Sequence, residues 1–134
     1  MEVETIEQSE YFTVSPGKFY KTFLNSDEHA IFTGAPASID AVVGGEFSVF
    51  DGFATGQTIE LEEGKKIVQK WQLQEIGWDE NHYSFVTLVL HPRNGGTLLE
   101  FTHSNVPADR VDVLAAGWVD YYWEPLKSYF ASLN

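Results

Sequence analysis

Two polar side chains within strand-like patterns of this sequence, His103 and Glu60, belong to the types that acid–base catalysis uses. The imidazole of His103 could transfer a proton or bind the polar head of a ligand. The carboxylate of Glu60, between Ile59 and Leu61, could act as a general base if it faced a cavity. The alternatives are a structural histidine at a strand end and a glutamate that faces solvent. An enzyme is therefore the less favoured class, and no catalytic residue is assigned.

Metal and thiol chemistry have little support. The sequence contains four histidines and no cysteine. His29, His82, His91 and His103 are scattered, without the H-x-H or H-x₃-H spacing that brings two imidazoles to one metal ion. Without cysteine there is neither a thiol nucleophile nor a zinc–thiolate site. We therefore predict no metal site and no cofactor.

Aromatic residues offer a different chemistry, the binding of an apolar or ring-containing ligand. Trp71, Trp118 and Tyr122 are candidates for the lining of a pocket, and they are equally compatible with a packed core. In a regular helix Trp123 falls on the opposite side from Trp118 and Tyr122. Trp123 is therefore also a candidate for an exposed anchor that contacts a partner protein.

Strands, two short helices and one long helix must position these residues. Ser15-Pro16 and Asn25 are typical of helix starts, and they follow a first strand at Ile6–Phe12. Asp51-Gly52 is typical of a tight turn between strands, and a loop is expected at Pro92–Gly96. The remaining predicted strands are Ala37–Val42, Glu46–Phe50, Thr55–Leu61, Lys66–Leu73, His82–Leu90 and Thr97–His103.

The last segment, about residues 108–133, is predicted to be a helix. Its apolar residues recur at helical spacing and form one stripe: Val111, Leu114, Ala115, Trp118, Tyr122, Leu126 and Tyr129. Pro125 removes a backbone donor and should disturb the helix near Tyr121. Successive strands with tight turns imply an antiparallel sheet, which must curl if one helix is to cover its apolar face.

Composition limits the classes of partner. The chain has 134 residues, is 43% hydrophobic and carries a formal net charge of −12, which predicts one folded domain spanning residues 1–134. The acidic balance disfavours nucleic acid and anionic membranes and favours a basic protein surface. No apolar run is long enough to cross a membrane, and the acidic N-terminus lacks a secretion signal. These features predict a cytoplasmic protein, either a monomer or a weak homodimer.

An ordered set of motifs carries a family resemblance: Gly44-Gly45-x-Phe47, Asp51-Gly52, Ile67-Val68-x-Lys70-Trp71, Thr97-x-Leu99 and Gly117-Trp118. The sequence resembles the AHSA type, the C-terminal domain of the activator of heat-shock-protein-90 ATPase, within the SRPBCC or START-like superfamily. The resemblance implies an α+β helix-grip fold (START/Bet v-like). In this fold six to seven antiparallel strands wrap around a long C-terminal helix, and two short helices follow strand 1.

The resemblance also implies a hydrophobic cavity between sheet and helix, which leads us to expect a small ligand-binding domain for an unknown apolar molecule. A second possibility is a co-chaperone module that stimulates a heat-shock chaperone ATPase, and a third is a cyclase- or hydrolase-like enzyme. Many bacterial relatives carry an arginine before the double glycine, where this sequence has Val42-Val43. The expected cavity residues are Phe47, Val49, Trp71, Leu99, Phe101, His103, Trp118 and Tyr122.

Overall fold

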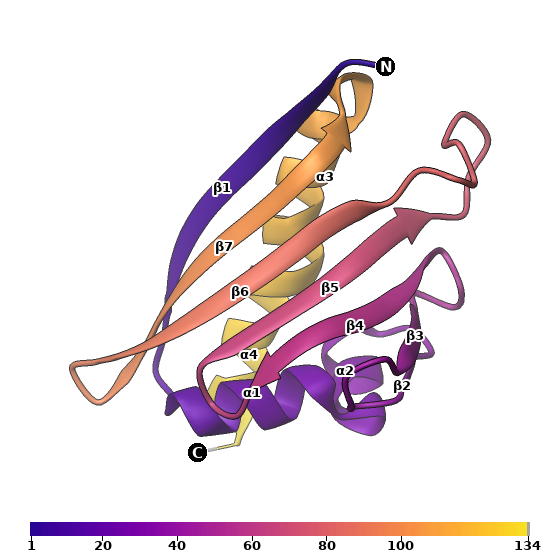
Figure 1. Ribbon diagram of the computed structural model, residues 1–134. Coiled ribbons are helices and arrows are strands. Elements are labelled where there is room, and N and C mark those ends of the chain that lie inside the picture. The colour runs from indigo at the N-terminus through magenta and orange to yellow at the C-terminus, as the bar shows by residue number, and fades with distance from the viewer. Residues whose placement is uncertain (134) are drawn as a thin grey trace.

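A seven-stranded sheet and a helical C-terminal segment dominate the computed structural model, which describes residues 1–133 (Figure 1). The strands are β1 (Val3–Phe12), β2 (Ser38–Ile39), β3 (Glu46–Val49), β4 (Ala54–Glu62), β5 (Lys66–Leu73), β6 (Ser84–Arg93) and β7 (Gly96–Pro107). The helical segments are α1 (Pro16–Leu24), α2 (Ser26–Thr33), a 3₁₀ turn (Ala108–Arg110), α3 (Val111–Trp118), a π turn (Val119–Trp123) and α4 (Glu124–Ser132).

The strand order is β1-β7-β6-β5-β4-β3-β2, and every neighbouring pair is antiparallel. The C-terminal helical segment runs behind one face of this sheet, while α1 and α2 lie together at one end of it (Figure 1). This arrangement confirms the predicted α+β fold with seven antiparallel strands, a long C-terminal helix and two short helices after strand 1. No helix within residues 1–133 is long and apolar enough to cross a membrane.

The two short helices begin where their capping residues predict. The side chain of Ser15 accepts a hydrogen bond from the backbone N–H of Lys18 (3.2 Å), and Asn25 caps Glu28 in the same way (2.9 Å). Each cap satisfies a backbone donor that the first turn of a helix leaves unpaired. At the end of α2, Gly34 adopts a left-handed conformation (φ 76°), which glycine accepts without strain.

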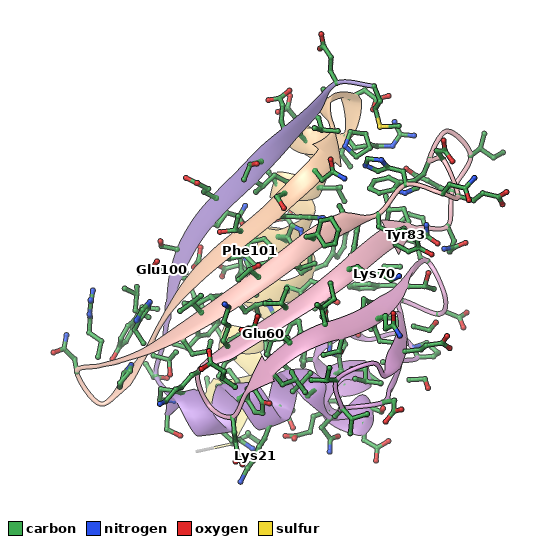
Figure 2. All side chains as sticks on the ribbon, viewed as in Figure 1. Lys21, Glu60, Lys70, Tyr83, Glu100 and Phe101 are labelled. Atoms are coloured by element: carbon green, nitrogen blue, oxygen red, sulfur yellow. The ribbon has the colours of Figure 1, made fainter. Side chains whose placement is uncertain are left out.

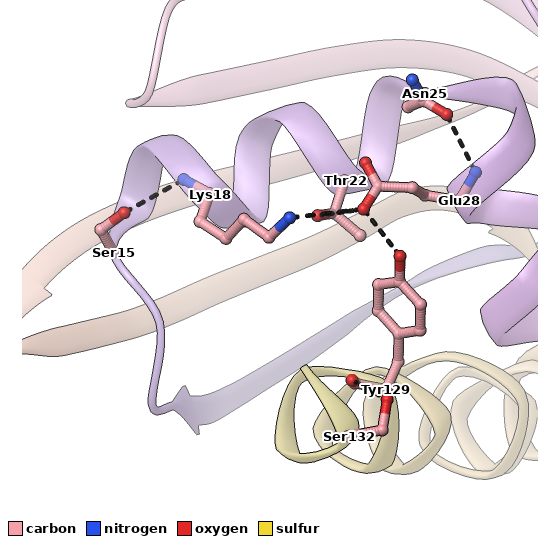
Figure 3. A network of polar contacts seen from close by, with 7 residues as sticks. All are labelled: Ser15, Lys18, Thr22, Asn25, Glu28, Tyr129 and Ser132. Carbon is pink, nitrogen blue, oxygen red and sulfur yellow. Dashed lines mark hydrogen bonds and ion pairs between the residues drawn. The ribbon is translucent and has the colours of Figure 1, made fainter. Parts of the chain in front are cut away.

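One carboxylate joins the short helices to the C-terminal helix (Figure 3). Oε1 of Glu28 on α2 accepts hydrogen bonds from the hydroxyl of Tyr129 on α4 (2.7 Å) and from Thr22 on α1 (3.5 Å). The ammonium group of Lys18 lies 3.4 Å from the same oxygen. A charged acceptor strengthens such bonds, so this network fixes α1 and α2 against the end of α4.

Two predicted segments differ from the structure because of turn geometry. The strand expected at Ala37–Val42 is limited to Ser38–Ile39, since the chain then enters a tight loop in which Gly45 N–H bonds to the carbonyl of Val42 (2.9 Å). The loop expected at Pro92–Gly96 is a two-residue turn. Asn94 (φ 50°) and Gly95 (φ 79°) are both left-handed, the geometry that lets β6 and β7 continue almost to the turn itself.

Candidate functional site

The eight residues predicted to line a cavity are all buried, with at most 5% of each exposed to solvent. Five of them face a small void of only about 10 Å³ between the sheet and the helix: Phe47, Val49, Trp71, Trp118 and Tyr122. A void of this size holds at most one water molecule. Leu99, Phe101 and His103 share one face of β7 and do not line that void. The closed interior is therefore filled by the protein's own aromatic side chains.

His103 is held by a chain of hydrogen bonds that fixes its tautomer. Indole N–H of Trp118 can only donate, so Nδ1 of His103 accepts from it (3.0 Å). The proton of the neutral ring then lies on Nε2, which donates to Oγ of Ser84 (2.7 Å), and that hydroxyl donates to the carbonyl of Trp71 (2.9 Å). Burial lowers the pKa of His103 to about 3. These contacts give His103 the properties of a structural, uncharged residue.

A second buried histidine couples α2 to the C-terminal helix. Nδ1 of His29 donates to the carbonyl of Phe23 (2.8 Å), which leaves Nε2 to accept from the hydroxyl of Tyr122 (3.0 Å). Burial lowers the pKa of His29 to about 4, against a smaller opposing effect of the bond to Phe23. Burial also raises the pKa of the Tyr122 hydroxyl, so both partners stay uncharged near neutral pH.

Glu60 lies on the solvent side of the sheet, away from both histidines. Figure 2 shows this face of the sheet, with Glu60 and Lys70 labelled on it. The Glu60 carboxylate is 3.1 Å from the ammonium group of Lys66, and about half of its side chain is exposed. Strict alternation from the buried Thr58 would turn Glu60 toward the core, but a register shift in β4 between Thr58 and Glu60 places it on the solvent face beside Ile59. His103 and Glu60 therefore do not converge, and no group of three metal-binding side chains occurs in residues 1–133.

Trp123 is fully buried, so the interpretation of this residue as an exposed partner anchor is wrong. Its ring is nearly parallel to that of Trp118, with centroids 5.6 Å apart, and its N–H donates to the Gln8 side chain on β1 (2.7 Å). The cause is the π turn at Val119–Trp123, where N–H of Glu124 bonds to the carbonyl of Val119. The wider turn moves Trp123 onto the face of Trp118. This turn ends two residues before Pro125, close to the predicted disturbance.

An open apolar groove lies between the sheet and α3, beside the closed interior. Its volume is about 450 Å³, within the usual range of ligand sites. The sheet contributes Ala54, Trp71 and Leu73, and the segment around the β3–β4 turn contributes Phe50 and Phe53. The opposite wall comes from the C-terminal helical segment: Val113, Leu114, Gly117, Trp118, Tyr121 and Tyr122. Three of the predicted residues, Trp71, Trp118 and Tyr122, thus line this groove.

An ion pair closes one end of the groove. Nε of Arg110 donates to the carboxylate of Glu75 (2.7 Å), and Nη1 lies 3.1 Å from the carboxylate of Asp109. The hydrogen bond to Glu75 and the negative charges of Glu75 and Asp109 raise the pKa of Arg110 above its ordinary value. Nη2 also donates to the carbonyl of Ile76 (3.4 Å), so Arg110 holds the loop after β5 against the start of α3.

The groove contains residues that the pattern of the sequence did not single out as a site. Phe50 and Phe53 flank the Asp51-Gly52 turn, where Phe50 (φ 53°) and Asp51 (φ 56°) are both left-handed. Glu75 and Arg110 are 35 positions apart in the sequence, so only the fold brings them together. The predicted turn at Asp51-Gly52 and the apolar stripe of the last helix were the available signals for this site.

A second hollow, of about 460 Å³, lies on the solvent face of the sheet. Most of its lining side chains are polar, and Lys70 places its ammonium group over the ring of Tyr83, 4.6 Å from the centroid (Figure 2). Since most of its lining is hydrophilic, this hollow differs from the aromatic cavity that the sequence predicted. The groove beside α3 is the candidate functional site.

Comparisons with known proteins agree with this architecture. The human protein "Activator of 90 kDa heat shock protein ATPase homolog 1" is 34% identical over 93% of this chain, which spans 36% of the human protein's length. The crystal structure of an HSP90 activator from Plasmodium falciparum superimposes with a TM-score of 0.89 and 27% identity, covering 95% of this chain and 96% of the other.

A further structure shows the fold alone. The solution structure of the Aha1 dimer from Colwellia psychrerythraea has a TM-score of 0.77 and 20% identity, covering 92% and 93% of the two chains.

The profile of the family described as "Activator of Hsp90 ATPase homolog 1-like protein" matches residues 13–131. That range includes β2 to β7, both short helices and nearly all of the C-terminal helical segment, so the chain belongs to the Activator of Hsp90 ATPase homolog 1-like family.

Proposed function

We propose that this chain is a co-chaperone module that binds an Hsp90-type chaperone and stimulates its ATPase. The observation that carries the proposal is the 34% identity with the human activator over 93% of the chain. The structure supports it in one respect: the groove beside α3 is open and apolar, and an exposed apolar surface commonly marks a protein-binding site. A cytosolic location and a monomer or weak homodimer, both expected from the sequence, are part of this proposal.

The direct test is the ATPase rate of a purified Hsp90 with and without the chain. We expect a saturable, several-fold stimulation, together with a complex on a sizing column. The chain alone, assayed at the same concentrations, controls for contaminating hydrolysis. Because the chain corresponds to only 36% of the human protein's length, its stimulation should be weaker than that of the full human protein. An unchanged rate and unchanged migration at saturating concentrations would contradict the proposal.

A second candidate function is the binding of an apolar small molecule in the same groove. The groove's volume of about 450 Å³ and its aromatic lining favour this possibility, whereas the small void of about 10 Å³ has no room for a ligand. Native mass spectrometry of the protein, isolated gently from its own cells, should then reveal a stoichiometric molecule. Trp71 and Trp118 line the groove, so removal of that molecule should change the tryptophan emission. A clean apo mass with unaltered emission would argue for the protein partner alone.

A further inference from the structure

The rim of the groove bears large apolar side chains that no part of the described chain covers. Val113 on α3 is 70% exposed, Tyr121 in the π turn 62%, and Phe53 on the opposite wall 47%. An exposed apolar patch of this kind commonly marks a protein-binding surface. A small molecule inside the groove would leave much of this rim in contact with water, whereas a polypeptide lying across it would cover both walls.

The charge around the groove is negative. Asp120 is exposed and lies on the edge of the helix that bears Val113 and Gly117, one turn after Gly117, whereas the exposed Asp112 projects from the far side of α3. Asp109 is also exposed at the end of the groove. Among the described residues that line the groove, Arg110 is the one basic residue, and its charge is already paired with Glu75 and Asp109. The rim therefore has unpaired negative charge and complements a positively charged partner.

We propose that this groove binds a basic amphipathic helix of a partner protein. Apolar residues at helical spacing would enter the groove between Phe53 and Val113, while lysine or arginine on the flanks would face Asp109 and Asp120. From Arg110 to Tyr121 the groove follows about 16 Å of helix, enough for roughly three turns of a partner helix. The inference rests on the proposed function for the identity of the partner, which would be the chaperone.

Gly117 provides a way to block the groove without disturbing the fold. It lies in α3 and lines the groove, and a Cβ placed there would contact only Cδ2 of Tyr121, at 3.7 Å. Its backbone is helical, so alanine or glutamine should be at least as favourable there as glycine. Gly117→Gln therefore fills the groove with a long polar side chain, and Ala116→Gln, which places the same side chain at an exposed position of α3 outside the lining, is the matched control.

The first experiment uses two designed peptide helices of about 14 residues, one of leucine and lysine and the other of leucine and glutamate. Fluorescence anisotropy gives the affinity, and NMR shifts of Phe53, Val113 and Gly117 locate the contact. We expect the lysine peptide to bind at the groove, with an affinity that falls as the salt concentration rises. We expect the glutamate peptide not to bind. Equal binding of both peptides, or shifts confined to other surfaces, would overturn the proposal.

The variants separate groove binding from general attraction to an acidic protein. Gly117→Gln should weaken binding of the lysine peptide about tenfold or more, and Ala116→Gln should change its affinity less than about threefold. Asp120→Lys should weaken binding far more than Glu63→Lys, an equal change in charge on the exposed β4–β5 turn, away from the groove. Equal affinities for Gly117→Gln and Ala116→Gln, or equal effects of the two charge reversals, would overturn the proposal.

The same variants in the chaperone ATPase assay distinguish the two proposals. If wild type stimulates Hsp90 and Gly117→Gln does not, while Ala116→Gln does, both proposals are supported. If all three stimulate equally, the co-chaperone function is supported and the groove is not its docking site. If none stimulates but the peptide pattern is observed, the chaperone proposal fails, and the groove is assigned to a different basic partner.

Discussion

Replacement of Trp123 by alanine is expected to lower the free energy of unfolding by about 4 kcal/mol. The side chain is fully buried and contacts Phe101 (ring centroids 5.0 Å apart) and Trp118 (5.6 Å). Its removal leaves a large cavity between β7 and the π turn. It also leaves the carbonyl oxygen of the Gln8 side chain without its donor. Urea denaturation followed by circular dichroism at pH 7 measures the change.

The neighbouring Tyr121 is the matched control, because it is an aromatic residue of the same π turn but is 62% exposed. Tyr121→Ala should cost less than about 1 kcal/mol. Trp123→Phe should have an intermediate effect, since it keeps a ring but loses the bond to Gln8. If Trp123→Ala and Tyr121→Ala were equally mild, the buried position of Trp123 would be wrong.

Acidification from pH 7 to pH 5 is expected to destabilise the protein by about 4 kcal/mol through His29 and His103. Burial lowers the pKa of these histidines to about 4 and about 3, whereas a histidine in an unfolded chain has a pKa near 6.5. Between these values the unfolded state binds more protons than the folded state. Their stabilising effect is therefore complete above about pH 6.5 and is lost as the pH falls toward 4. Denaturation curves between pH 7 and pH 5 measure the loss.

His103→Gln serves as the control for this assignment. A glutamine amide can still donate to Ser84 and accept from Trp118 but does not titrate, so about half of the acid sensitivity should disappear. NMR of the imidazole protons would show directly that both rings remain neutral at pH 5.5. A stability that is flat between pH 7 and pH 5, or imidazole signals that titrate near pH 6.5, would refute the buried, neutral state.

Local rules predicted much of the fold. Ser15 and Asn25 begin helices because their side chains satisfy backbone donors, and β5 has the predicted bounds Lys66–Leu73. Alternation placed Leu99, Phe101 and His103 on one buried face. These features depend on residues close together in the sequence, which is why the pattern alone could reveal them.

The candidate site was less predictable because it depends on departures from regular geometry. The apolar stripe predicted for the last helix rested on a regular 3.6 residues per turn. The π turn changes which side chains face the sheet and brings Trp123 into the core. The ion pair of Glu75 with Arg110 joins residues from the end of β5 and the start of α3. The packing that leaves a void of only about 10 Å³ depends on how the aromatic rings interlock, which the spacing of residues in the sequence does not encode.

β1 is synthesised before the other six strands of the sheet, yet its pairing partner β7 is the last of the seven to be made. Val3 pairs with Pro107 and Phe12 with Thr97, so the nascent strand must wait until most of the chain has been synthesised. During this interval its apolar residues Ile6 and Phe12 have no sheet to cover them. Glutamates at several positions of β1 give the waiting strand a negative charge, which opposes its pairing with the same strand of a neighbouring nascent chain.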